Sequence, residues 1–126
     1  MHHVAQGKNQ CGQACVAMIT DMTLYISVLE IGKTGLTRTK DIAHGLRKHG
    51  WNCDDRLTRR SKKNPVPSRA IVKVKWPGTT RSHWVVVWDC VWHDPEKVDG
   101  EPMPNFDAVD NYGGHVTSFL RIWEKA

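Results

Sequence analysis

The chain has 126 residues, which fits a single domain spanning 1–126, and 40% of them are hydrophobic and 25% charged, as in an ordinary globular protein. No apolar stretch approaches the length of a membrane span, and no secretory signal precedes the first apolar run. Four cysteines are too few for a dense disulfide framework in a chain of this length. These properties exclude a membrane partner and a disulfide scaffold, and they predict a cytoplasmic protein with reduced thiols.

The net charge is +5, and six of the 18 basic residues lie in the segment 56–69. A solvated loop is the plainest interpretation of this segment, and a site for an acidic partner is the alternative. Nucleic acid is disfavoured because no aromatic residues interleave with the cations to stack on bases.

The first half of the chain predicts helices. Apolar residues recur at helical spacing after Cys11. Thr23 is placed to cap a second helix, which Gly32 ends, and Gly50 ends a third. The predicted helices span 11–22, 24–31 and 39–49.

Beyond Gly50 the pattern changes to that of strands. Apolar residues alternate from Val72 onward, and HWVVVW at 83–88 is apolar on both faces, as in a central strand. Helices first and strands after are typical of an α+β domain, with helices packed on one antiparallel sheet. The predicted strands span 51–57, 70–76, 83–88, 91–93 and 116–124, with a turn at 77–81 and a loop at 94–105.

Cys11 stands where the first helix should begin. The unpaired N–H groups and the positive dipole end of a helix stabilise a negative sulfur, so a nucleophilic thiol is favoured there over an inert structural cysteine. Gly12 would let a substrate backbone approach closely. Cys15 lies one turn further, inside the apolar run, and is expected to pack in the core.

A cysteine nucleophile needs a base, usually a histidine that the fold brings near. Among seven histidines, His83 opens the most apolar strand directly after a polar turn, where it would be held at the mouth of a cleft. A hairpin with a two- or four-residue loop after this strand places Val87 opposite Trp92. Asp94 then lies diagonal to His83 on the same face. A three-residue loop would turn Asp94 to the other face.

The order of these motifs resembles a known enzyme family. The motifs are QGKNQCGQACVAMI at 6–19, GLTRTKDIAHGLRKHGW at 35–51, SHWVVVW at 82–88 and VWHDP at 91–95. Their succession is similar to the papain-like cysteine peptidases, specifically the bacteriocin-processing, double-glycine-leader branch. That branch pairs a glutamine and a C-G-x-A-C motif with a later H-[WY]-V-V-V strand and a D-P pair.

The resemblance implies a papain-like fold, with the nucleophile at the N-terminus of a helix that packs on an antiparallel sheet. It also implies Cys11 as nucleophile, His83 as general base and acid, and Asp94 as the residue that orients the imidazole. Gln6 would be the side-chain oxyanion donor, although it stands one residue closer to Cys11 than the pattern has it, and an exposed loop residue is the alternative. The expected substrate is a peptide or protein, and no cofactor or metal is expected.

Two further interpretations concern neighbouring residues. Trp92 shares the face of His83 in the predicted hairpin and is a candidate to line the substrate cleft, whereas Trp84 and Trp88 are expected in the core. A zinc site is the rival to a catalytic thiol. Its ligands would be Cys11, Cys15, Cys90 and His93.

Three functions fit this sequence. The main prediction is a cysteine peptidase that hydrolyses peptide bonds. The second is the same thiol chemistry on another amide, in a deamidase or acyltransferase. The third is a catalytically inactive module that binds a peptide or a partner.

Overall fold

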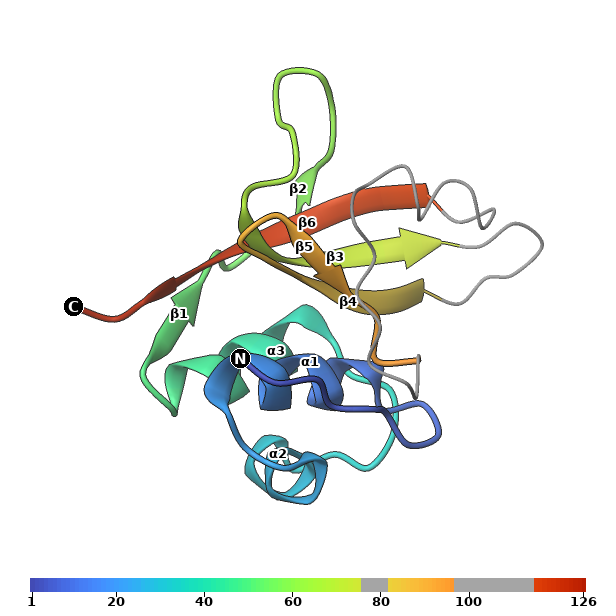
Figure 1. The fold of residues 1–126 in the computed structure, drawn as a ribbon, viewed down its shortest axis with the longest axis vertical. Helices are drawn as coiled ribbons and strands as arrows, with labels where there is room; N and C mark the ends of the chain where they lie inside the picture. Colours follow the sequence, from blue (N-terminus) through green and yellow to red (C-terminus); the bar gives the residue numbers. More distant parts are fainter. Residues whose placement is uncertain (76–81, 97–114) are drawn as a thin grey trace.

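The computed structural model describes residues 1–75, 82–96 and 115–126 (Figure 1). Within them the chain forms three helices and an antiparallel β-sheet, so the predicted α+β class is confirmed. The turn predicted at 77–81 and the predicted loop beyond residue 96 lie outside the described residues.

The three helices begin where the sequence predicts, and two of them end earlier. α1 ends before Asp21, which takes a left-handed conformation (φ 62°) and donates its N–H to the Ala17 carbonyl. The Thr23 hydroxyl caps α2 by accepting the N–H of Ile26 at 3.2 Å, and Gly32 (φ 80°) ends that helix. No single helix in the described part of the chain is long and apolar enough to cross a membrane. The helices are α1 (Cys11–Thr20), α2 (Leu24–Ile31) and α3 (Thr39–Arg47).

The strands form one sheet in the order β1-β6-β3-β4-β5, and β2 also pairs with β6. The strand predicted over 51–57 is wrong in its second half. The Asp54 side chain there accepts the N–H of Arg121 at 3.0 Å, so a carboxylate replaces a backbone acceptor and the ladder breaks. The strands are β1 (Trp51–Cys53), β2 (Thr58–Arg59), β3 (Arg69–Lys75), β4 (Ser82–Trp88), β5 (Val91–His93) and β6 (His115–Glu124).

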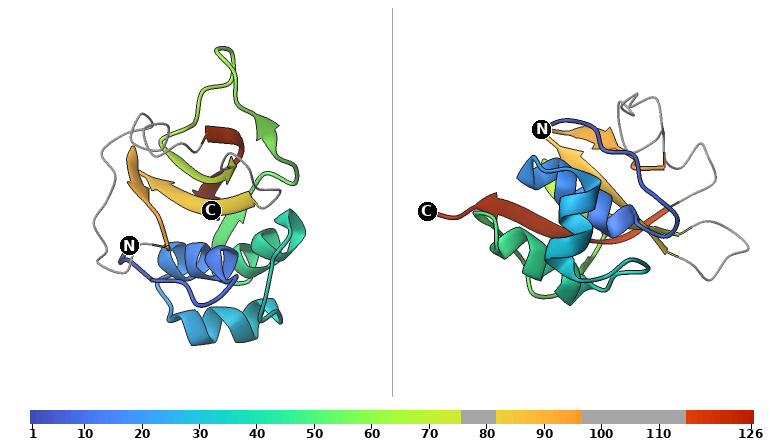
Figure 2. Two further views of the ribbon diagram at one scale, coloured as in Figure 1. Left: turned by 90° about the vertical axis from the view of Figure 1, so that its right-hand side faces the viewer. Right: turned by 90° about the horizontal axis from the view of Figure 1, so that it is seen from below.

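The helices cover one face of the sheet, with α1 and α3 against the strands and α2 outermost (Figures 1 and 2). The main core lies between these layers and includes α1 residues together with Ile71, Trp84 and Val86 of the sheet. A second cluster on the other face joins Val85, Val87 and further valines of β3 with Trp92. Strand alternation therefore gives β3 and β4 two buried faces, as expected for central strands.

Candidate active site

Cys11 is the first residue of α1 and is buried. The residue before the helix, Gln10, provides no side-chain cap, because its amide donates to the Thr34 carbonyl at 3.0 Å instead. No cap therefore occupies the N–H groups of the first turn, and the positive end of the helix dipole lies at the thiol.

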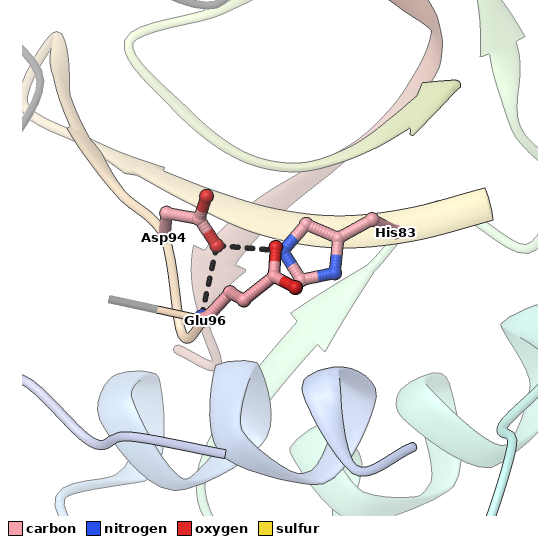
Figure 3. Close-up of side chains that lie close together, drawn as sticks. All are labelled: His83, Asp94 and Glu96. Atoms are coloured by element: carbon pink, nitrogen blue, oxygen red, sulfur yellow. Dashed lines mark hydrogen bonds and ion pairs between the residues drawn. The ribbon is translucent and has the colours of Figure 1, made fainter. Parts of the chain in front are cut away.

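His83 and Asp94 form a buried pair beside α1 (Figure 3). His83 Nε2 lies 2.6 Å from Asp94 Oδ1, and each side chain keeps 10% or less of its surface exposed. The backbone N–H of Glu96 donates to the same Oδ1 at 2.9 Å. The carboxylate is therefore held from two sides, which fixes the orientation of the imidazole.

Cys11 lies close enough to the His83 ring to influence the pKa of the imidazole. Since Nε2 is bonded to Asp94, Nδ1 is the ring nitrogen that remains for the thiol. Burial by itself lowers the pKa of His83, but the hydrogen bond to Asp94 and the neighbouring Asp94 and Cys11 side chains outweigh it and raise the pKa to about 10. The surroundings therefore favour a protonated imidazole near neutral pH.

The hairpin between β4 and β5 has the predicted register. Asp89 and Cys90 make a two-residue turn, both with positive φ, and Val87 lies opposite Trp92. Positive φ at both turn residues matches the twist of a tight hairpin. This turn brings Asp94, one residue past the end of β5, to His83.

Cys15 lies one turn inside α1 and is fully buried in the main core. Burial raises the pKa of its thiol well above the ordinary value, and the charges of Cys11 and Asp94 add to this effect. A neutral thiol in an apolar environment packs as a small hydrophobic side chain. The prediction that Cys15 is core packing is confirmed.

The carboxylate of Glu96 lies beside the His83 ring (Figure 3). One ligand atom from each of His83, Asp94 and Glu96 lies within 4.8 Å of the others, which makes them the one group in the described part of the chain that could hold a metal ion. An ion there would compete with the His83–Asp94 hydrogen bond for the same atoms.

The zinc ligands that formed the rival prediction do not come together. Cys15 is in the core, whereas Cys90 is exposed in the turn between β4 and β5. All four cysteines of the chain are free thiols. A Cys3His centre is therefore not assembled in this fold.

Gln6 lies next to the His83–Asp94 pair through its backbone, because its N–H donates to the Pro95 carbonyl at 2.8 Å. Its side-chain Oε1 is buried and has no hydrogen-bond partner among the residues that the structure describes. Gln10, the other glutamine of the motif, is bonded to Thr34 and is not available. Gln6 is thus the glutamine of the motif that the fold places beside the His83–Asp94 pair.

Gly12 packs closely against the chain before α3. A Cβ atom built on Gly12 would overlap Thr37 Oγ1 and lie 3.1 Å from Thr37 Cβ. This packing is a second reason for a glycine here, and the role of Gly12 in substrate binding stays a prediction. Thr37 Oγ1 itself is buried and has no hydrogen-bond partner among the described residues.

The structure does not bring Trp92 to Cys11. It lines a hollow of about 480 Å³ on the other face of the sheet, together with Cys90 and the basic loop residues Arg60 and Lys62. The tryptophan beside Cys11 is Trp84, expected only as core packing, which lines a hollow of about 330 Å³ with Cys11 itself. The predicted register of the β4–β5 hairpin is confirmed. Trp92 nevertheless lies away from Cys11, because the hollow with Cys11 is on the face of the sheet that the helices cover.

Two residues of the Cys11 region have no role in the sequence prediction. Gln13 is fully buried, and its Nε2 donates to the carbonyls of Lys33 at 3.0 Å and Gly35 at 2.7 Å, which ties the chain before α3 to α1. Lys73 of β3 lines the hollow beside Cys11. Lys73 lies two residues after Ile71 in β3, so both side chains share the face of the sheet that carries the main core. A charged side chain is unexpected on that face, and this was the signal that could have identified Lys73.

Comparison with protein-family models gives no match for this chain, and comparison with curated proteins gives none either. The functional argument therefore depends on the geometry of Cys11, His83 and Asp94.

Proposed function

We propose that the chain is a papain-like cysteine peptidase in which Cys11 attacks the peptide carbonyl, His83 transfers the proton and Asp94 orients His83. One observation carries this proposal: the buried His83 ring is hydrogen-bonded to Asp94, and Cys11 at the N-terminus of α1 lies close enough to the ring to raise its pKa. A nucleophile, a base and an orienting group linked in this way are the usual parts of such a site.

In the proposed reaction Cys11 has given its proton to His83 Nδ1 before the substrate binds, and the sulfur then forms a bond to the carbonyl carbon. His83 then protonates the amine nitrogen as the C–N bond breaks, which leaves a thioester on Cys11. Water loses a proton to His83 and attacks the thioester, and the Cys11 thiolate beside protonated His83 is restored as the acid leaves. The net reaction is hydrolysis of one amide bond, with the enzyme unchanged.

The carbonyl oxygen becomes negative in both tetrahedral intermediates. The first-turn N–H groups of α1, which the Gln10 side chain does not cap, are suited to stabilise it, and Gln6 is proposed as the side-chain donor. The position of the half-buried Gln6 beside Pro95, with its Oε1 atom buried, supports this assignment. Loss of one such donor costs about 3 kcal/mol of transition-state stabilisation in comparable sites.

The test is selective alkylation of Cys11. Cys90 is the one exposed thiol, so a Cys90→Ser background leaves Cys11 to be followed by mass spectrometry with iodoacetamide. At pH 6.5 a free thiol is only about 1% ionised, and Cys11 should react roughly tenfold faster than such a thiol. His83→Ala should abolish the excess, and Cys11→Ser in the same background is the matched control. A Cys11 that reacts no faster than a free thiol would refute the catalytic assignment.

The same site supports two other outcomes. Release of ammonia from glutamine side chains without backbone cleavage would identify a deamidase, and transfer of the acyl group to an added amine would identify an acyltransferase. Cleavage of a peptide library, lost in Cys11→Ser, would identify the proposed peptidase.

A further inference from the structure

The hollow beside Cys11 has a volume of about 330 Å³, at the low end of the range for ligand pockets. Any substrate whose carbonyl carbon meets the Cys11 sulfur must occupy it in part, because Cys11 forms its wall. Side chains from the chain before α3 and from β3 and β4 complete it. They are Leu36, Thr37, Arg38, Thr39, Lys73, Ser82 and Trp84.

Two of these side chains are cationic, and none of the described ones is acidic. Lys73 pairs with Trp84 across β3 and β4, and its Nζ lies 5.7 Å from the centre of the Trp84 ring. Neither Lys73 nor Arg38 forms a salt bridge in the described part of the chain, whereas many other basic side chains do.

The nearest carboxylate on the α3 side is already engaged. Asp41 Oδ2 accepts the backbone N–H of Arg38 at 2.7 Å and the Lys33 ammonium at 2.9 Å. The charge of Asp41 is therefore already partly neutralised by these two partners and is less able to balance Lys73 and Arg38. Lys73 is half-buried, which makes its lack of an acidic partner more costly than at a fully exposed position.

Polar groups in the wall of the hollow also favour a negatively charged ligand. The Thr37 hydroxyl is buried and has no hydrogen-bond partner in the described part of the chain, so it can donate a hydrogen bond to a ligand. The N-termini of two helices, at Cys11 of α1 and Thr39 of α3, also border the hollow and favour negative charge. Leu36 and Trp84 supply apolar surface for the carbon atoms of a side chain.

We propose that this hollow selects substrates with a carboxylate beside the amide bond that Cys11 attacks, with Lys73 and Arg38 as the residues that determine specificity. The inference rests on the proposed function and names its substrate class. The carboxylate is either an Asp or Glu side chain or the C-terminal carboxylate of a short leaving group. Both present the same anion to the two cations.

The first arm of the test uses peptide ketone electrophiles that differ only in Glu, Gln or Lys next to the reactive carbon, and it measures the rate of Cys11 labelling. The Glu probe should react roughly five- to tenfold faster than the Gln probe, and the Lys probe should be the slowest. Lys73→Met should bring the Glu/Gln ratio close to one, and Lys73→Arg should retain it. Lys62→Met removes the same charge from the other hollow and should leave the ratio unchanged.

The second arm compares kcat/KM for leaving groups that end in a free carboxylate or in a carboxamide. A preference confined to this arm identifies the C-terminal carboxylate, and one confined to the first arm identifies the side chain. Equal rates in both arms, or a preference that persists in the Lys73→Met, Arg38→Gln double variant, overturn the substrate class while the peptidase assignment stands. Failure of every probe to label Cys11 overturns the proposed function and this inference with it.

Discussion

Replacement of Asp94 by Asn tests the central hydrogen bond of the candidate site. The amide keeps the shape of the side chain but loses its charge, next to a ring nitrogen 2.6 Å away. His83 has its pKa raised from 6.5 to about 10, a rise that corresponds to roughly 5 kcal/mol in favour of the protonated ring. Asp94 and Cys11 share this effect, and loss of a neighbouring charge changes a pKa by roughly 1 to 3 pH units. Asp94→Asn should therefore lower the pKa of His83 by that amount.

The measurement is a titration of the His83 ring protons by NMR, with His83→Gln to assign the signal. Glu96→Gln is the matched control, because it removes the other carboxylate beside the ring and keeps the backbone N–H that bonds to Asp94. The pKa should move much less in this control than in Asp94→Asn. An unchanged pKa in Asp94→Asn, or an equal change in both variants, would show that Asp94 does not orient and charge the ring.

The same pair makes the stability of the fold depend on pH. Because the folded pKa of His83 lies above its ordinary value of 6.5, the protonated ring stabilises the folded chain. This contribution is fully present below about pH 6.5 and is lost as the pH rises through about 10. The free energy of unfolding, measured by urea titration, should therefore fall across this window. The fall should be smaller and should occur at lower pH in Asp94→Asn, and an identical profile in both proteins would contradict the reasoning.

Three further changes probe the surroundings of the nucleophile. Gly12→Ala should destabilise the fold by about 1–3 kcal/mol through overlap with Thr37, and Thr37→Ala should restore part of the loss in urea titrations. Gln13→Ala leaves two carbonyls without their donor and should cost about 1–3 kcal/mol; a change below 0.5 would contradict the proposed tie between α1 and the chain before α3. Zinc should slow Cys11 alkylation, and Glu96→Gln should weaken this inhibition; equal inhibition in both proteins would exclude Glu96 as a ligand.

Local sequence signals predicted most of the elements, because caps, glycine stops and strand alternation act over a few residues. The ends of elements depended on features that periodicity does not report. Asp21 adopts a left-handed conformation that ends α1, and the Asp54 side chain replaces a backbone acceptor and divides the predicted strand 51–57. The approach of Asp94 to His83 could be predicted from the sequence, because the register of the β4–β5 hairpin depends on one short turn.

The walls of the site were less accessible to prediction. The approach of Thr37 to Gly12 joins two segments whose separation in space no local pattern specifies. Trp92 was assigned to the cleft because it shares the face of His83 in the predicted hairpin. In the structure Trp92 packs in the second cluster, and Trp84 lies in the hollow with Cys11. The sequence could show which residues share a face of the sheet, but the packing of the helices decided which face holds that hollow.

The charges of the site connect the two proposals. When His83 has taken the proton of Cys11, the imidazolium is balanced by the sulfur, and the carboxylate of Asp94 leaves the triad with one net negative charge. A substrate carboxylate brought next to this group would be repelled if the rest of the wall were neutral. Lys73 and Arg38 supply two positive charges in the hollow, where the described wall contains no acid. Removing both should therefore slow labelling by the Glu probe more than by the Gln probe, and the difference should shrink as salt screens the exposed part of the field.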